Sequence, residues 1–289
     1  MAGNTEPPVL LKALQHNCAQ GGQTMEAIMK SAVKREADLV LIQEPWGEKV
    51  KDSTRSHPSF TFIKGEESAV PKCWIAVNRT SGCWITELKN LAKGCRNYVQ
   101  VIEVVPPGGD AIIIANVYDQ EDRTKKSRPA QDAAWGEIVK LRSMIISRDM
   151  NAHSKMWNPK ATYSRNHTFG ECLIEEEDLF VWNMEEATRK GPEAMNHFII
   201  GLTLSSPNIE LDWRLLDEEA AGSDHEVLLW GVLGTPPPRA DTSAETTGWD
   251  ISGWDPTGES EEEGKRKSEE RRAKARECYL VGARRTPIL

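Results

Sequence analysis

Several features that would tie the chain to a particular class of protein are missing from its sequence. No apolar run among the 289 residues approaches a membrane span, and the N-terminal segment lacks the basic start and long apolar core of a signal peptide. The six cysteines are scattered, without a pair of the C-x-x-C kind, which favours reduced thiols and argues against a structural zinc site. We therefore expect an intracellular protein, nuclear or cytoplasmic, with no membrane partner.

An excess of positive charge is missing as well. The chain has 44 acidic and 36 basic residues, which gives a formal net charge of -8 at pH 7. This balance argues against a protein that coats nucleic acid through bulk charge, but it suits a carboxylate site for a divalent cation with local basic loops for phosphate. Each of the two basic clusters, taken alone, is better explained as a solvated surface loop: Lys49, Lys51 and Arg55, and Arg123, Lys125, Lys126 and Arg128.

Hydrophobic periodicity predicts many strands and few helices. Leu10–Asn17 is typical of a strand, and the residues from Thr24 to about Glu36 are typical of an amphipathic helix. Leu39–Ile42 is typical of a short buried strand. This pattern favours two packed sheets flanked by helices over a doubly wound nucleotide-binding fold. Further strands are expected at Trp74–Val77, Tyr98–Val105, Ala111–Tyr118, Met144–Ser147, Leu179–Trp182, Phe198–Leu204 and Val227–Val232, and helices around Asp132–Arg142 and Phe169–Glu177.

The composition changes sharply after Val232. Gly234–Pro238 ends any regular element, and the residues from Glu259 to Glu277 are almost all charged, with an acidic block before a basic one. We expect one domain over residues 9–234. A Pro-rich linker and a charged tail, disordered or helical, should follow over residues 235–289.

Polar residues recur where the predicted strands end. Sites in layered α/β folds form from loops at strand ends, because the scaffold holds those loops rigidly. A single such residue is explained by the turn preferences of Asn and Asp, but a set on several strands predicts a functional site. The set comprises Asn17, Gln43, Glu44, Asn116, Tyr118, Asp149, Asn151, His153, Ser223, Asp224 and His225.

Two of these carboxylates are candidates for a metal site. Mg²⁺ takes oxygen ligands and binds through one or two carboxylates plus substrate phosphate. Glu44 and Asp224 are the candidate pair, with Asn17 close by and Mn²⁺ as the alternative ion. Taken alone, Glu44 is as well explained as a surface acid.

Three further residues have the chemistry of phosphodiester hydrolysis. Asp149 could orient or deprotonate a water molecule, while Asn151 and His225 could donate hydrogen bonds to the charge that develops on the phosphate. Two of them also have an ordinary structural explanation, since Asp149 could cap a helix and His225 could be a core histidine. The alternatives remain open for each residue taken singly.

Four motifs in order give the sequence a family resemblance. They are Gln43–Trp46 (QEPW), Asn116–Tyr118 (NVY), Asp149–His153 (DMNAH) and Ser223–His225 (SDH). In this order they resemble the endonuclease domains of LINE-type (non-LTR) retrotransposons, within the endonuclease/exonuclease/phosphatase superfamily. The likeness runs from about Leu11 to Val232 and is close to fungal elements. Supporting segments are Ser154–Pro159, Thr188–Arg189, Leu202–Pro207 and Thr247–Asp250.

The resemblance implies a fold, a reaction and a partner. The fold is a four-layer α/β/β/α sandwich of two mixed sheets, DNase I-like, and the reaction is Mg²⁺-dependent nicking of DNA to leave a 3′-hydroxyl that primes reverse transcription. No small-molecule cofactor is implied, and the oligomeric state is not indicated. The implied roles are Glu44 and Asp224 as metal carboxylates beside Asn17, Tyr118 on the phosphate, Asp149 activating water, Asn151 at the transition state and His225 on the scissile phosphate.

The sequence departs from the family pattern at two positions. Gly201 replaces the Asp expected to hydrogen-bond the catalytic histidine, and Arg148 stands before Asp149 where the family usually has Gly. Loss of the carboxylate would remove tautomer control from His225, and Arg148 would disturb the turn that aims Asp149. The predicted nicking activity is therefore impaired. The alternatives are a catalytically inactive DNA-binding remnant, or another phosphoesterase such as a polyphosphoinositide phosphatase or a deadenylase.

Overall fold

The computed structural model describes most of residues 7–234, the part of the sequence in which strands and helices are predicted. The described residues are 7–47, 57–65, 72–119, 134, 136–159, 171, 174–175, 179–183, 186–190, 198–216 and 222–234. The two basic clusters and the tail from residue 235 onward lie outside this set. No helix among the described residues is long and apolar enough to cross a membrane.

The first sheet has six strands in the order β11-β12-β1-β2-β4-β3. Among its described strands, β1 and β2 are parallel and are connected by the helix α1, whereas the other neighbouring pairs are antiparallel. The bounds are β1 (Val9–Asn17), α1 (Gly22–Lys34), β2 (Leu39–Gln43), β3 (Phe60–Lys64), β4 (Cys73–Asn78), β11 (Leu211–Leu216) and β12 (Val227–Leu233).

The second sheet repeats this plan in the order β5-β6-β7-β8-β10-β9. Here β7 and β8 form the only parallel pair. A short 3₁₀ helix, η2 (Lys89–Ala92), precedes β6. The strand bounds are β5 (Trp84–Glu87), β6 (Val99–Val105), β7 (Ile112–Tyr118), β8 (Met144–Asp149), β9 (Phe180–Val181) and β10 (Gly201–Ser205).

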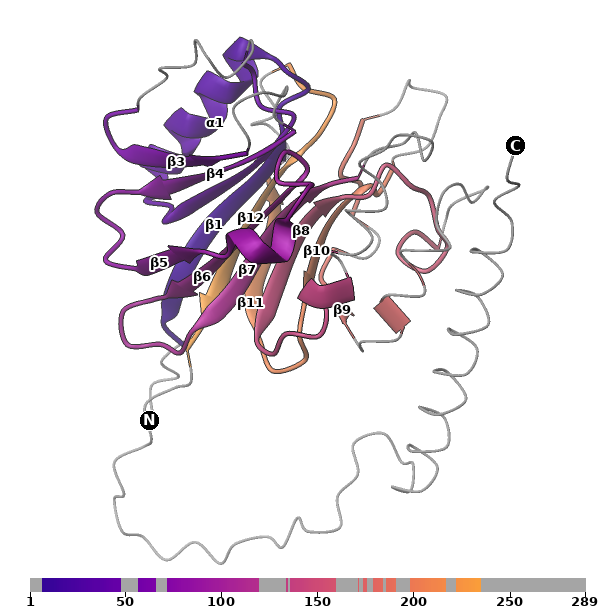
Figure 1. Cartoon of the computed structure of the whole chain (residues 1–289). Coiled ribbons are helices and arrows are strands. Elements are labelled where there is room, and N and C mark those ends of the chain that lie inside the picture. Colours follow the sequence, from indigo (N-terminus) through magenta and orange to yellow (C-terminus); the bar gives the residue numbers. More distant parts are fainter. Residues whose placement is uncertain are drawn as a thin grey trace, which may run out of the picture.

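Strand alternation builds the layers. In β1, Leu11 and Ala13 enter the cluster between the sheets, whereas Leu14 enters the cluster beneath α1. The helix covers the outer face of the first sheet with Met25, Ile28, Met29 and Ala32 (Figure 1). The inner cluster joins both sheets through Leu11, Ala13, Leu39, Leu41, Ile75, Ile102, Val104, Ile112, Ile114, Ile145, Trp230 and Val232.

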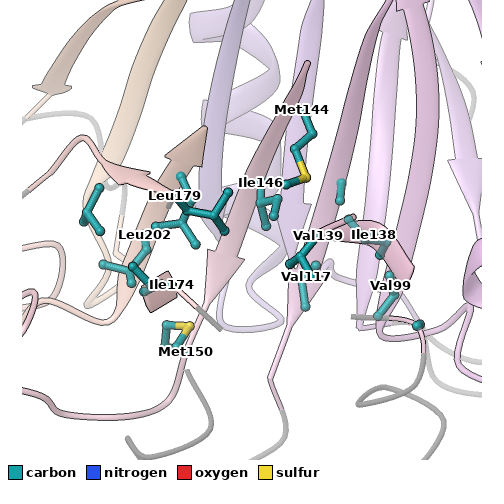
Figure 2. Close-up of a cluster of buried hydrophobic side chains, with 14 of the residues drawn as sticks. Val99, Val117, Ile138, Val139, Met144, Ile146, Met150, Ile174, Leu179 and Leu202 are labelled. Atoms are coloured by element: carbon teal, nitrogen blue, oxygen red, sulfur yellow. The ribbon is translucent and has the colours of Figure 1, made fainter. Parts of the chain in front are cut away.

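A third cluster covers the outer face of the second sheet. In this cluster Val117, Ile146 and Leu202 of the sheet pack with side chains from outside its strands, among them Ile138 and Ile174 (Figure 2). Helical residues occur there at 134, 136–138, 171 and 174–175. The predicted fold of two mixed sheets flanked by helices is therefore confirmed.

The structure differs from the predicted elements where the hydrophobic signal is weak. Strands β3 and β5 lie at sheet edges, β11 is an edge strand with half-exposed residues, and none of the three was predicted. The strand expected from Phe198 begins at Gly201, because Phe198 pairs with Arg189 in an isolated bridge instead. Among the described cysteines, Cys18, Cys73, Cys83 and Cys95 are free thiols, as predicted.

Arg148 does not disturb the strand that carries Asp149. Strand β8 continues through Arg148, whose partners in the sheets are Val117 and Leu202, and Asp149 is its last residue. The guanidinium is buried and forms an ion pair with the buried carboxylate of Asp119. The expected disturbance is thus wrong for the backbone, because the cation has a partner inside the protein.

This buried pair predicts a large stability effect. Asp119→Ala should lower the free energy of unfolding by about 3–5 kcal/mol, because it leaves a buried guanidinium without its carboxylate. Urea denaturation measures the loss. Asp212→Ala is the matched control, since Asp212 pairs with Arg214 at the surface and should contribute less than about 1 kcal/mol. Equal effects of the two substitutions would contradict the assignment.

Candidate active site

The site forms where both parallel strand pairs end. Parallel strands bring their carboxyl ends to one edge, so Asn17 of β1 lies opposite Gln43 of β2, and Tyr118 of β7 lies opposite Asp149 of β8. The stacking of the two sheets brings these two edges together. Of the predicted residues, Asn17, Glu44, Tyr118, Asp149 and Asn151 are linked to one another by hydrogen bonds.

Buried hydrogen bonds join the two sheets at this edge. Asn17 Nδ2 donates to Asp149 Oδ2 at 2.6 Å. Gln43 Nε2 donates to Asn116 Oδ1 at 2.7 Å, and Asn116 Nδ2 donates back to the carbonyl oxygens of Ile42 at 3.0 Å and Trp74 at 2.8 Å. We call Asn17, Gln43, Asn116 and Asp149 the polar seam. Each of these side chains is buried with a partner, so the seam fixes the two sheets relative to each other.

Asp149 lies at the centre of the seam, with 1% of its surface exposed. Its Oδ1 accepts the backbone N–H of Asn151 at 3.1 Å. Burial raises the pKa of the Asp149 carboxyl, and Glu44 adds to the rise, whereas His225, Asn17 and Asn151 oppose it. The net result is a raised pKa, which makes Asp149 a stronger proton acceptor than an exposed aspartate.

Glu44 follows β2 in a left-handed backbone conformation, with φ of +42°. This conformation is costly for a residue with a β-carbon and is typical of functional sites. Lys72 Nζ donates to Glu44 Oε1 at 2.9 Å, and Gln20 Nε2 lies 3.4 Å from the same oxygen. Burial would raise the pKa of the Glu44 carboxyl, but Lys72, Gln20 and Tyr118 together bring the pKa below its usual value. Glu44 is therefore ionised at neutral pH.

Tyr118 and Asn151 connect these two carboxylates. The Tyr118 hydroxyl hydrogen-bonds with Glu44 and Asn151, and burial with the charges of Glu44 and Asp149 raises its pKa. Asn151 has φ of +43°, a conformation that asparagine tolerates better than most residues, and its Nδ2 donates to the carbonyl oxygen of Asp119 at 2.7 Å. Tyr118 stays a neutral hydrogen-bonding group beside the seam.

His225 and Asp224 reach the site from the segment before β12. The Ser223 hydroxyl donates to the carbonyl oxygen of Asn17 at 2.8 Å and accepts the N–H of His225 at 3.1 Å, which ties this segment to the end of β1. Arg189 pairs with His225 along the backbone, and its Nε donates to Asp224 Oδ2 at 2.6 Å. Burial would raise the pKa of Asp224, but the Arg189 hydrogen bond and the nearby charges lower it overall.

Gly201 is the first residue of β10 and pairs with Asp149. Strand β10 lies one strand from the edge of the second sheet. A β-carbon at 201 would meet Thr188 Oγ1 at 3.5 Å and Gln15 Nε2 at 3.9 Å, both ordinary contacts. His225 and Gly201 line the same small cavity of about 10 Å³.

The donor set suits a hard cation. Glu44, Asp224 and Asn17 offer only oxygen ligands besides the Asn17 amide nitrogen, which is committed to Asp149. Within the described part of the chain, no three acidic, histidine or cysteine side chains converge on one point.

Comparisons with known proteins agree with the sequence resemblance. A family model described as endonuclease-reverse transcriptase matches residues 112–229. The endonuclease domain of TRAS1, a telomere-specific non-LTR retrotransposon, is 18% identical with a TM-score of 0.62, and the match covers 77% of this chain and 98% of that one. No curated protein sequence matches the chain.

Two other solved structures share the fold. An endonuclease/exonuclease/phosphatase family protein from Bacteroides thetaiotaomicron is 13% identical with a TM-score of 0.52, over 80% of this chain and 100% of that one. D. rerio TDP2, solved with a single-strand DNA product, is 11% identical with a TM-score of 0.50, over 78% and 99%. At these identities the matches show the fold, which is that of the DNase I-like endonuclease/exonuclease/phosphatase proteins.

The family model and the TRAS1 match agree with the resemblance to endonucleases of non-LTR retrotransposons, and the structural match shows the DNase I-like fold. The closer likeness to fungal elements stays a prediction.

Two site residues were not predicted from the sequence. Lys72 contacts Glu44 and its Nζ lies 5.2 Å from the centre of the Tyr118 ring, and Arg189 contacts Asp224. Arg189 stands in the Thr188–Arg189 segment quoted for the resemblance, so a signal existed for it. Lys72 precedes β4 without any motif, and no pattern in the sequence points to it.

A buried histidine beside the site makes the stability depend on pH. Burial lowers the pKa of His16 to about 4 from an ordinary value of 6.5, and its Nδ1 lies 3.2 Å from the carbonyl oxygen of Glu226. Between these pH values the unfolded chain binds a proton that the folded chain does not. This contribution to stability is therefore lost as pH falls from 6.5 towards 4.

His16→Leu should remove that dependence. Relative to the variant, the parent protein should lose about 3 kcal/mol of unfolding free energy between pH 7 and pH 4. Urea denaturation of both proteins at several pH values gives the difference directly. A difference that stays constant over this range would show that His16 is not buried in its neutral form.

Proposed function

We propose that the chain is a metal-dependent phosphodiesterase that nicks DNA, with its catalytic domain within residues 9–234. The observation that carries the proposal is Asp149, a buried carboxylate with a raised pKa that Asn17 and Asn151 hold at the meeting point of the two sheets. Perturbed carboxylates of this kind, held at strand ends, are typical of general bases. The family model and the retrotransposon relative support DNA as the substrate.

In this proposal Asp149 takes the proton from the water molecule that attacks phosphorus. Its fixed position keeps one carboxylate oxygen on Asn17 and the other on the Asn151 N–H, so the carboxylate does not need to reorient during the reaction. The raised pKa brings its basicity closer to that needed at neutral pH. As the new P–O bond forms, the bond between phosphorus and the 3′-oxygen breaks and this oxygen takes up a proton from water, so the nicked strand carries a 3′-hydroxyl and a 5′-phosphate.

The phosphate would contact the groups around Asp149. His225, Asn151 and Tyr118 carry N–H or O–H donors on the same edge and would stabilise the charge that develops on the non-bridging oxygens. A divalent cation, Mg²⁺ or Mn²⁺, would be held by Glu44 and Asp224 with Asn17 nearby. When bound, it supplies Lewis-acid stabilisation of the phosphate charge.

The second candidate function is a DNA-binding remnant that does not cut. The observation that favours it is the environment of His225, whose recorded ion-pair contact among the described residues is long: Asp224 Oδ1 lies 3.8 Å from Nε2. This separation exceeds a hydrogen bond, and Gly201 supplies no carboxylate. Plasmid DNA, poly(A) and inositol phosphates compared as substrates separate both candidates from another phosphoesterase.

The first test is plasmid nicking with and without metal. The parent protein should nick supercoiled plasmid in Mg²⁺ and stop in EDTA, and Asp149→Asn should lower the rate by about 10²–10⁴, the usual contribution of a general base. Asp212→Asn serves as a control on an exposed acid of β11. Equal rates for parent and Asp149→Asn, with both proteins folded, would reject Asp149 as the base.

The second test returns a carboxylate to position 201. Gly201→Asp should raise the nicking rate by a factor of ten or more, because a carboxylate beside His225 fixes its tautomer and supports its charged form. A tenfold change corresponds to about 1.4 kcal/mol of barrier. The β-carbon fits, since its closest contact is 3.5 Å from Thr188 Oγ1.

The controls for this substitution separate charge from volume. Gly201→Asn can hydrogen-bond without charge, and His225→Ala removes the imidazole that the carboxylate would assist. Gly136→Ala adds a β-carbon where nothing lies within 4 Å. If Gly201→Asp remains folded but nicks no faster than the parent, then the absent carboxylate does not limit the reaction.

A further inference from the structure

Each carboxylate proposed to bind metal already holds a cationic side chain of the same chain. Lys72 Nζ lies 2.9 Å from Glu44 Oε1, and Arg189 Nε lies 2.6 Å from Asp224 Oδ2. The first pair stands at the ends of β2 and β4, and the second stands beside the segment that leads into β12. The site therefore contains two ion pairs, and neither Lys72 nor Arg189 has a role in the reaction proposed above.

Lys72 has hydrogen-bonding capacity beyond its contact with Glu44. A lysine ammonium carries three donors, and the hydrogen bond to Glu44 uses one of them. The Glu44 N–H donates to the Lys72 carbonyl oxygen at 2.9 Å, so the two backbones are joined directly. The ammonium also lies 5.2 Å from the centre of the Tyr118 ring, where the face of the ring attracts a cation. Lys72 is thus held beside the residue proposed to contact phosphate.

Arg189 has more unused donors than Lys72. Its guanidinium has five N–H groups, and Nε is the one that contacts Asp224. Among the described residues no other side-chain partner is recorded for it, and 40% of the side chain is exposed. Its backbone N–H donates to the Phe198 carbonyl oxygen and its backbone pairs with that of His225, which fixes the position of Arg189 in the site. The planar end of the side chain is therefore available to a phosphate in a bidentate geometry.

The ion pair between Arg189 and Asp224 is too exposed to contribute much to the stability of the fold. Its two side chains are 40% and 42% exposed, and exposed pairs contribute about 0–1 kcal/mol. The pair between Arg214 and Asp212 has similar exposure but lies away from the site, on β11. Position, and not strength, distinguishes Arg189 from an ordinary surface arginine. In a chain with a net charge of -8, contacts with a polyanion depend on such local cations.

We propose that Lys72 and Arg189 bind phosphate groups of the DNA strand, and that Glu44 and Asp224 hold the two cations in place before the strand arrives. This inference rests on the proposed function, because the ligand class is the phosphodiester backbone. Lys72 would bind a phosphate group beside β2 and β4, and Arg189 would bind a phosphate group beside His225. Each cation is a binding residue and does not take part in proton transfer.

The test measures DNA binding without turnover. Binding of a short duplex to Asp149→Asn protein in EDTA is followed by fluorescence anisotropy at several salt concentrations. Adding Lys72→Gln or Arg189→Gln should each lower the slope of log affinity against log salt by about 0.9, and the double variant by about twice that amount. At fixed salt each single variant should bind several-fold more weakly. Arg189→Lys should keep most of the slope, because it keeps the charge.

Matched controls remove cations of surface ion pairs elsewhere. Arg214→Gln and Lys30→Gln, the latter from a pair with Glu26 on α1, should leave the salt slope unchanged. Thermal melting checks that every variant is folded. Unchanged slopes for both Lys72→Gln and Arg189→Gln would overturn the inference, as would the absence of any salt-dependent binding by the Asp149→Asn protein.

These outcomes are independent of the nicking result. If the active protein cuts plasmid but the slopes do not change, the proposed function stands and the inference fails. If no cutting occurs but the slopes fall as expected, the two cations bind DNA in a protein that has lost its reaction.

Discussion

The hydrogen bond between Asn17 and Asp149 is the interaction on which the site depends. It joins the end of a strand in one sheet to the end of a strand in the other, inside the protein. Apolar packing between two sheets is non-directional and tolerates small sliding movements, whereas buried polar groups must keep their partners. Together with the bond between Gln43 and Asn116, it sets where the two sheet edges meet. Every other site residue is placed relative to that meeting point.

At this edge the pKa values of two carboxylic acids shift in opposite directions. Asp149 is fully enclosed, and burial raises its pKa more than His225, Asn17 and Asn151 lower it. Glu44 lies a short distance away with Lys72 on its oxygen, and its pKa falls below the usual value. One acid is thereby suited to accept a proton and the other to stay charged. This division of roles arises from local environment, since both residues are ordinary carboxylic acids.

The fold and the polar seam could be predicted from the sequence because both depend on strand ends. Buried strands are short apolar runs, and the polar residues after them, such as Asn17 and Glu44, stand out against that background. Strands β5 and β11 were missed because edge strands need only a weak apolar pattern. The contact of Lys72 with Glu44 could not be predicted, because it depends on the register of β4 against β2, which no local pattern specifies.

The position of Gly201 illustrates the same limit. The sequence shows that a side chain is missing, but not what a side chain there would touch. The structure places Thr188 and Gln15 first, with His225 on the wall of the shared cavity. Arg148 shows the reverse case: the sequence suggests that this long cation disturbs the strand, whereas in the fold it forms an ion pair with Asp119.

The pairing of β1 with β12 has a consequence for the synthesis of the protein. The first strand is flanked by β2 on one side and by the last strand on the other, with Val9 opposite Leu233. Until residue 233 has left the ribosome, one edge of β1 lacks its partner strand. Such long-range pairing makes folding slow and late. A chain that stops early therefore loses the first strand's partner and the histidine together, and yields no partly working domain.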